Sequence, residues 1–269
     1  SLRALGGTHR LEDFAACGAD YVTPVSGHYR GHELVELPPN GQGATAILMA
    51  QMLERFDISG LDPMGAERAH LELEIQKIAY AARDEAIADP AHMTVPVERF
   101  TDPATAAALA ARVDPLRAAT PPLRPLANEH KETILITVVD RDRMAVSLIY
   151  SVFNDFGGCL ASEKFGINFN NRAAGFTLAE GHPNEAAGSK RPMHTIIPAL
   201  LRKDSETVMA FGVMGGGYQP QGHARVMSNV LDYGMDVQAA IDAARLSWRA
   251  SEVSGERGYA PEAPMALKA

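Results

Sequence analysis

Apolar positions follow a helical period in the first half of the chain and a strand-like pattern in the second. Before residue 114, apolar residues return every three or four positions, which is typical of helices that bury one face. Helices are therefore predicted over residues 9–18, 44–55, 65–88 and 102–113, and short strands over 21–25 and 33–37. After residue 132, β-branched runs between glycine-rich turns predict strands over 133–139, 144–152, 196–202 and 207–213, then helices over 222–231 and 236–245.

A proline-rich segment, residues 114–132, separates the two patterns and is predicted to be a linker or an exposed loop. The chain then divides into a mostly helical part, residues 1–132, and a strand-rich part, residues 133–269. Thr101 and Asp236 are the predicted N-caps of two of the helices. Strands paired as hairpins and followed by helices favour an α+β or layered α/β/α fold over a doubly wound parallel sheet.

Composition and charge exclude several classes of function. The net charge is −8 and no basic stripe is present, so the electrostatic signature of a nucleic-acid-binding protein is missing. No apolar run reaches the ~20 residues that a membrane span requires. The nine histidines lack metal-ligand spacing, and we expect neither a metal nor an organic cofactor.

The two cysteines, Cys17 and Cys159, are expected to be free thiols in the core, and a single disulfide is the alternative. Few cysteines and no signal peptide at the start of this sequence favour a cytoplasmic protein. A periplasmic or secreted location stays open.

Thr133 begins the first strand of the second half, directly after the linker. Cleavage of the Glu132–Thr133 bond would give Thr133 a free α-amine beside its hydroxyl. Such an amine titrates near ~8 and can act as the base for the hydroxyl, which is an established way to activate a weak nucleophile. The alternative is that a threonine at a strand start reflects β propensity alone.

Three glycines, Gly215 to Gly217, follow the strand at 207–213. Glycine lets the backbone approach a ligand closely, and two adjacent amides can bind an oxyanion. The alternatives are a tight turn, or a phosphate cradle, which fits poorly because no Lys-Ser/Thr follows. His194 and His223 lie near this turn, each either a structural hydrogen-bonding group or a catalyst.

Several ordered motifs together resemble the γ-glutamyltransferase (glutathione hydrolase) family of N-terminal-nucleophile hydrolases, in a divergent branch, over nearly the whole chain. Residues 29–43, with Pro-Pro-Asn-Gly-Gln-Gly, resemble the late large subunit, and Thr133 resembles the start of the small subunit. The segments 190–198, 212–217 and 229–245 resemble its Lys-Arg-Pro segment, oxyanion turn and closing helices.

This resemblance implies a four-layer αββα sandwich made of two chains, residues 1–132 as the end of the large subunit and residues 133–269 as the small subunit. The two would form a heterodimer, and an assembly of two heterodimers stays open. Thr133 would be both the self-processing and the catalytic nucleophile. Ser151 would position it, and the amides of Gly215 and Gly216 would form the oxyanion hole.

Four positions depart from the family's pattern for γ-glutamyl substrates. Phe153 replaces an Asn that binds the substrate's amino-acid end, and Gly175 replaces an Asp that binds the α-amino group. His194 and Thr195 replace a pair of serines that contact the α-carboxylate. An ammonium group that loses its carboxylate partner in a buried site binds several kcal/mol less well, so we expect a γ-glutamyl group to bind poorly.

The substrate pocket is therefore assigned to Phe153, Arg172, His194 and Thr195. Arg172 either binds a carboxylate or forms a structural ion pair. The predicted function is a self-processing amidohydrolase that acts on small carboxylate-bearing amides, such as glutaryl or oxamate-like ones, through an acyl-enzyme on Thr133. The alternatives are a true γ-glutamyltransferase and an inactive binding module.

Overall fold

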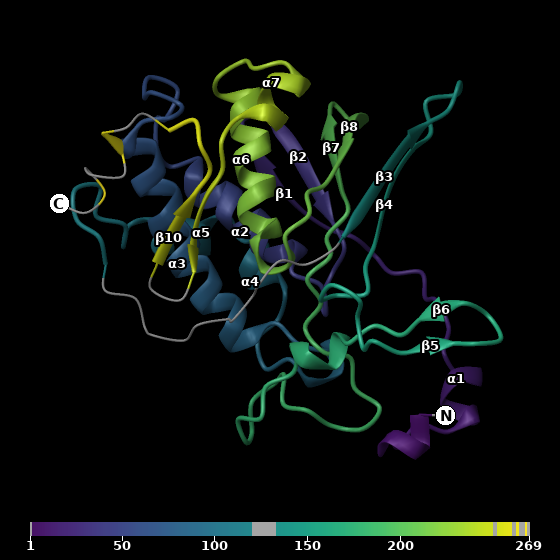
Figure 1. Cartoon of the computed structure of the whole chain (residues 1–269). Coiled ribbons are helices and arrows are strands. Elements are labelled where there is room, and N and C mark those ends of the chain that lie inside the picture. The colour runs from purple at the N-terminus through teal and green to yellow at the C-terminus, as the bar shows by residue number, and fades with distance from the viewer. Residues whose placement is uncertain (1, 120–132, 250–251, 260–261, 264–266, 268–269) are drawn as a thin grey trace.

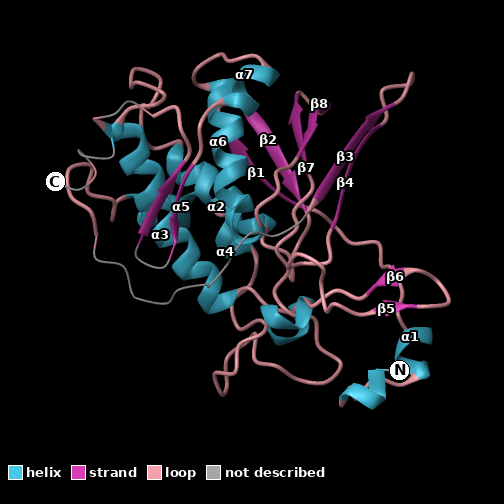
Figure 2. Ribbon diagram, in the orientation of Figure 1, coloured by secondary structure: helices cyan, strands magenta, loops and turns pink. Residues whose placement is uncertain are grey.

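A computed structural model describes residues 2–119, 133–249, 252–259, 262–263 and 267. Its helices are α1 (Leu11–Ala15), α2 (Gly43–Leu53), α3 (Ala66–Ala86), α4 (Glu98–Thr101), α5 (Pro103–Ala110), α6 (Gln219–Leu231) and α7 (Val237–Asp242). Its strands are β1 (Val25–Tyr29), β2 (His32–Glu36), β3 (Ile134–Val139), β4 (Ala145–Tyr150), β5 (Ala161–Ser162), β6 (Ile167–Asn168), β7 (Ala199–Lys203), β8 (Glu206–Phe211), β9 (Leu246–Arg249) and β10 (Glu252–Gly255). The α+β class is confirmed (Figure 2).

The central sheet is antiparallel and joins the two halves of the chain. Its strand order is β1-β2-β7-β8, so that β2 from the first half pairs with β7 from the second, with Leu34 opposite Leu201. Helices α2, α3 and α6 gather on one side of these strands (Figure 1). The contact between β2 and β7 means that the parts on either side of the linker share one core.

Helix α2 is the centre of that core. Its sequence, Gly-Ala-Thr-Ala-Ile-Leu-Met-Ala-Gln-Met-Leu, is apolar on nearly every side, and every residue from Gly43 to Leu53 is buried. A helix that is hydrophobic all round belongs in an interior. It packs against β1 on the sheet and against α3, α5 and α6. The N-terminus of α2 is buried, and so are the residues just before it, Gly41 and Gln42.

The hairpin β3–β4 stands beside β7 and β8 (Figure 1), and Ser147 Oγ donates a hydrogen bond of 2.8 Å to the Phe211 carbonyl. Opposite partners in its register share a face. One face carries six apolar side chains that are 41–55% exposed: Ile134, Ile136, Val138, Val146, Leu148 and Tyr150. The hairpin therefore presents an apolar face that no described residue covers.

Most predicted elements are confirmed within a few residues, one is wrong, and one is followed by strands that were not predicted. Residues 21–24 form no strand, because β1 starts at Val25 and turns into β2 through Arg30 and Gly31, both at positive φ, as a two-residue hairpin loop requires. The helix expected over 236–245 ends at Asp242, and the chain then forms β9 and β10. Trp248 in β9 exchanges backbone hydrogen bonds with the Gln76 side chain, a distant contact that no local pattern encodes.

Two smaller expectations also need correction. Asp102, not Thr101, caps α5, since its carboxylate accepts hydrogen bonds from the backbone amides of residues 104 and 105. Asp236 caps α7 as predicted. Cys17 and Cys159 are free, but both are exposed, so the expectation of core thiols is wrong. No helix in the described part of the chain is long and apolar enough to cross a membrane.

Candidate active site

Thr133 and Ser151 lie at the same end of the β3–β4 hairpin. The register pairs Ile134 with Tyr150, so the residues just beyond them are also neighbours. Thr133 is 5% exposed, and its Oγ1 donates a hydrogen bond of 3.5 Å to Ser151 Oγ. Glu132, on the other side of the predicted cleavage bond, lies outside the described residues.

Phe153 continues this group of residues. Its backbone amide donates a hydrogen bond of 2.9 Å to Ser151 Oγ, and its φ of +83° is a strained conformation for a residue with a side chain. The ring is buried, with the Arg172 guanidinium 4.3 Å from its centre. Phe153 thus connects the hydroxyl pair to a buried cation.

Arg172 has no acidic partner among the described residues. Its Nη1 donates a hydrogen bond of 2.7 Å to Thr195 Oγ1, and its Nη2 is buried without a protein partner. Burial lowers the pKa of Arg172 to about 10, so the side chain stays cationic at neutral pH. The structural ion pair, one of two interpretations of Arg172, is therefore absent from the described part of the chain, and a charged nitrogen remains available to an anion.

His194 is held neutral next to that cation. Burial, and then the positive charge of Arg172, lower the pKa of His194 to about 4. Its Nδ1 accepts a hydrogen bond of 3.3 Å from the Ile196 amide, which assigns the proton to Nε2. At neutral pH, the ring can therefore donate one hydrogen bond without adding charge to the pocket.

Gly175 stands at the position where the resemblance to the family implies an Asp. Because Gly175 has no side chain, the backbone of Met193 packs closely against it. A Cβ atom at residue 175 would lie 2.8 Å from the Met193 carbonyl oxygen. Asn184 holds the two segments together. Its Nδ2 donates a hydrogen bond of 2.7 Å to the Gly175 carbonyl, and its Oδ1 accepts a hydrogen bond of 2.9 Å from the Met193 amide. Asn184 stands in no motif of the sequence and was not predicted as a site residue.

The glycine turn leads directly into α6. Gly215 and Gly216 have φ values of +121° and +57°, a left-handed conformation that favours glycine. The carbonyl oxygen of Gly216 accepts a hydrogen bond of 2.9 Å from Nε2 of Gln42, which also donates 2.7 Å to the Thr195 carbonyl. Gln42 was not singled out in the sequence, although it stands within the Pro-Pro-Asn-Gly-Gln-Gly motif.

His223 lies on α6, beyond the turn, and is fully buried. Its Nδ1 is 2.7 Å from Glu36 Oε1, and neither side chain is exposed. Burial raises the pKa of Glu36 to about 7, although the charge of His223 opposes that shift. His223 is therefore a partner of Glu36, which fits the structural reading of this histidine.

Six of the predicted site residues, together with Gln42, form one continuous series of contacts from the hydroxyl pair to the glycine turn. In order, its members are Thr133, Ser151, Phe153, Arg172, Thr195, Gln42 and Gly216. These residues come from five separated parts of the sequence, namely residue 42, residues 133–153, and residues 172, 195 and 216. The fold therefore links a nucleophile candidate, a buried cation and the glycine turn in one network of contacts.

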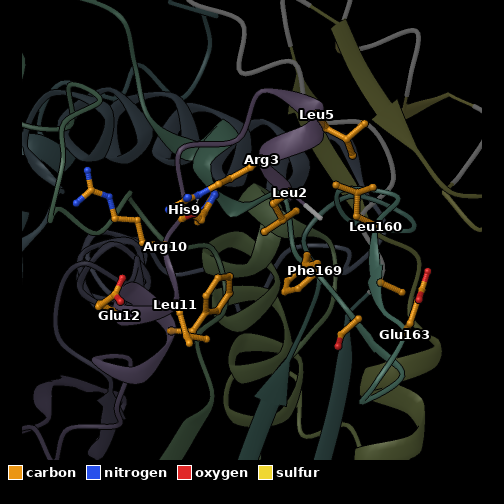
Figure 3. A pocket seen from close by; sticks show the side chains of 13 residues that line it. Leu2, Arg3, Leu5, His9, Arg10, Leu11, Glu12, Leu160, Glu163 and Phe169 are labelled. Atoms are coloured by element: carbon orange, nitrogen blue, oxygen red, sulfur yellow. Dashed lines mark hydrogen bonds between the residues drawn. The ribbon is translucent and has the colours of Figure 1, made fainter.

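A cavity of about 650 Å³ lies elsewhere, between the N-terminal segment and the β5–β6 hairpin (Figure 3). Arg3 and Arg10 line one side and Phe169 the other. None of the predicted site residues lines it. The described residues contain no group of three or more His, Cys, Asp or Glu side chains placed to hold a metal ion.

Comparison with known proteins gives a consistent result. Residues 1–269 match the family described as gamma-glutamyltranspeptidase. The glutathione hydrolase-like YwrD proenzyme of Bacillus subtilis strain 168 is 34% identical, over 88% of this chain and 45% of its own length. The oxamate amidohydrolase proenzyme of Klebsiella pneumoniae is 31% identical, over 91% of this chain and 45% of its own length.

Among solved structures, cephalosporin acylase from Bacillus halodurans superposes with a TM-score of 0.89 and 32% identity, covering 99% of this chain and 48% of that one. The chain thus spans about half the length of the relatives it matches. A family match over all 269 residues, supported by these relatives, shows that the chain belongs to the γ-glutamyltranspeptidase family.

Proposed function

We propose that this protein is a self-processing amidohydrolase whose nucleophile is Thr133. The observation that carries the proposal is the placement of the Thr133 hydroxyl, buried at the start of β3 and within 3.5 Å of Ser151 Oγ. The relatives support it, since their names include hydrolase and acylase, and two of them are called proenzymes.

In the proposed mechanism, cleavage of the Glu132–Thr133 bond frees the Thr133 α-amine. This amine accepts the hydroxyl proton while Thr133 Oγ1 attacks the carbonyl carbon of a substrate amide. The amides of Gly215 and Gly216 donate hydrogen bonds to the developing oxyanion. The protonated amine then gives its proton to the leaving nitrogen, and water hydrolyses the ester on Thr133 to regenerate the enzyme.

The substrates we propose are small amides whose acyl group carries a carboxylate. Arg172 supports this, because it is a buried cation with an unpartnered Nη2 and a fixed hydrogen bond to Thr195. A carboxylate can accept two parallel hydrogen bonds from a guanidinium. The neutral His194 ring could donate a further hydrogen bond. In contrast, Gly175 offers no carboxylate to the α-amino group of a γ-glutamyl substrate.

We further propose that residues 1–132 end a large subunit, that residues 133–269 form a small one, and that the complete protein has the four-layer αββα arrangement. The apolar face of the β3–β4 hairpin supports this arrangement, because in such a sandwich a second sheet would cover a face of this kind. The network between Gln42 and Gly216 would then join the two subunits after cleavage.

Intact-mass spectrometry tests the nucleophile directly. The wild-type protein should give two fragments that meet between residues 132 and 133, and Thr133→Ala should remain one chain. Thr137→Ala is the matched control, since Thr137 is an exposed threonine on the same strand and should not affect cleavage. An uncut wild-type chain would overturn the mechanism and favour a binding module that keeps the fold.

Chromogenic anilides test the substrate class. Glutaryl-p-nitroanilide should be hydrolysed with a higher kcat/KM than γ-glutamyl-p-nitroanilide. Arg172→Met should lose about 10²-fold or more in kcat/KM for the glutaryl substrate, since an ionic hydrogen bond is worth ~1.5–3 kcal/mol and two are expected. Comparable activity on both anilides would instead favour the alternative of a true γ-glutamyltransferase or glutathione hydrolase, and one relative is named glutathione hydrolase-like.

A further inference from the structure

We propose that Gln42 is a positioning residue for catalysis, which fixes the oxyanion turn relative to the substrate pocket by holding the carbonyls of Gly216 and Thr195 with one side-chain amide. This inference rests on the proposed function. Gln42 belongs to the part of the chain before the predicted cleavage bond, whereas the two carbonyls belong to the part after it.

The Gln42 side chain uses every polar atom it has. Its Nε2 donates to the Thr195 carbonyl at 2.7 Å and to the Gly216 carbonyl at 2.9 Å. Its Oε1 accepts 2.8 Å from Nη1 of Arg83, which also donates 3.3 Å to the Gly217 carbonyl. Gln42 and Arg83 are both 0% exposed. Water therefore cannot replace these bonds.

This arrangement requires a primary amide in one orientation. Carbonyl oxygens only accept and a guanidinium only donates, so the NH₂ group must face residues 195 and 216 and the oxygen must face Arg83. Glutamate has nearly the same shape, but it would place an oxygen against two carbonyl oxygens. Methionine would fill the space without any donor. Two nearly isosteric substitutions thus remove the function of this side chain with little change in volume.

The position of Gln42 is fixed independently of its side chain. Its backbone amide donates 3.1 Å to the His194 carbonyl, and the His194 amide donates 2.8 Å to the Asn40 carbonyl. Gln42 is also the N-cap residue of α2, yet its side chain makes no hydrogen bond to that helix. The amide is therefore directed away from its own helix and toward the two site segments.

Thr195 gives this contact its importance for substrate geometry. Its carbonyl is held by Gln42, and its hydroxyl accepts the hydrogen bond from Arg172. The same amide that holds the Gly216 carbonyl therefore also anchors the residue beside the buried cation. An acyl group held at Arg172 must place its carbonyl oxygen at the glycine turn, and displacements of ~0.5 Å in such sites reduce catalysis. Gln42 thereby sets the distance between the Arg172 side and the glycine turn.

Three variants test the inference: Gln42→Glu, Gln42→Met and, as matched control, Gln51→Glu. Gln51 is buried in the same helix, and its Nε2 donates to the Thr101 carbonyl at 3.0 Å, away from the site. Each purified protein is checked for self-cleavage by intact mass and for its melting temperature. Then kcat and KM are measured with glutaryl-p-nitroanilide.

We expect the Gln42 variants to fold and to lose about 10²-fold in kcat with KM little changed, because the oxyanion contact is made in the transition state. The Gln51 variant should keep the wild-type kcat. If Gln42→Glu fails to fold because of its buried charge, the kcat of the neutral Gln42→Met variant tests the inference.

A wild-type kcat in either folded Gln42 variant would overturn the inference. So would an equal loss in the Gln51 control, or failure of both Gln42 variants to fold, which would make Gln42 merely structural. If the wild-type protein neither cleaves itself nor hydrolyses the anilide, the proposed function fails, and this inference fails with it. If the wild-type protein is active and the Gln42 variants keep the wild-type kcat, only this inference is refuted, and the proposed function stands.

Discussion

Replacement of Glu36 by glutamine should change how the stability of the protein depends on pH. Glu36 is fully buried at the end of β2, and burial raises its pKa from 4.5 to about 7. Its hydrogen-bonding partner is His223, 2.7 Å away, whose effect on the carboxyl pKa is smaller than that of burial. The folded protein therefore prefers the neutral carboxylic acid.

The sign and size follow from the two pKa values. Below pH 4.5, Glu36 is protonated in both the folded and the unfolded chain, and its stabilising contribution is fully present. As the pH rises from 4.5 to about 7, the unfolded chain ionises first, and this contribution is lost. Each pKa unit corresponds to about 1.4 kcal/mol, so the loss is about 3 kcal/mol. Glutamine does not titrate, so the Glu36→Gln variant does not undergo this loss of stability.

The assay is urea unfolding at several pH values between 4.5 and 8, followed by the fluorescence of Trp248, the single tryptophan. All proteins carry Thr133→Ala, so that cleavage does not vary. The free energy of unfolding of Glu36→Gln should gain about 3 kcal/mol relative to its parent across this range. Glu33→Gln is the control. Glu33 lies on β2, like Glu36, and its half-buried carboxylate pairs with Arg202. Parallel profiles for Glu36→Gln and its parent would refute the reasoning.

Three further predictions concern the site and the core. Gly175→Ala should lower the free energy of unfolding by about 1–3 kcal/mol, because its Cβ would lie 2.8 Å from a backbone carbonyl, whereas Gly188→Ala, in open space, should not. Glu72→Gln should cost about 3–5 kcal/mol in the same urea assay, since it leaves two buried arginines without their carboxylate, and unchanged stability would contradict this. Ser151→Ala should slow self-cleavage in a mass-spectrometric time course, while Ser151→Thr retains the hydroxyl; equal rates in both would show that the Thr133 hydroxyl does not need this neighbour.

Periodicity alone predicted much of the fold, because the elements concerned are defined by their own residues. Helix α3 is the clearest case, predicted over 65–88 and found at Ala66–Ala86. Elements that depend on distant partners were missed. The β9–β10 hairpin is one, since Trp248 is held by Gln76 on α3, and no window of sequence contains both residues.

The site shows the same division. The residues that motifs singled out, such as Thr133 and Arg172, lie in one series of contacts. Residues that act through backbone carbonyls were not found. Gln42 binds two backbone groups of distant segments, and Asn184 binds two backbone groups nine residues away on either side; such roles leave no spacing or charge pattern in the sequence. The environment of Arg172 also required coordinates, because both a carboxylate site and an ion pair were compatible with its sequence context.

The packing at Gly175 limits how this protein could change its substrate during evolution. Any side chain at residue 175 meets the Met193 carbonyl, and Asn184 prevents the two segments from separating. A mutation that introduced the acidic residue of the transpeptidases would therefore destabilise the protein before it improved binding of an α-amino group. An earlier, permissive change at the Asn184 contact would let the two segments move apart and would lower the cost of that mutation.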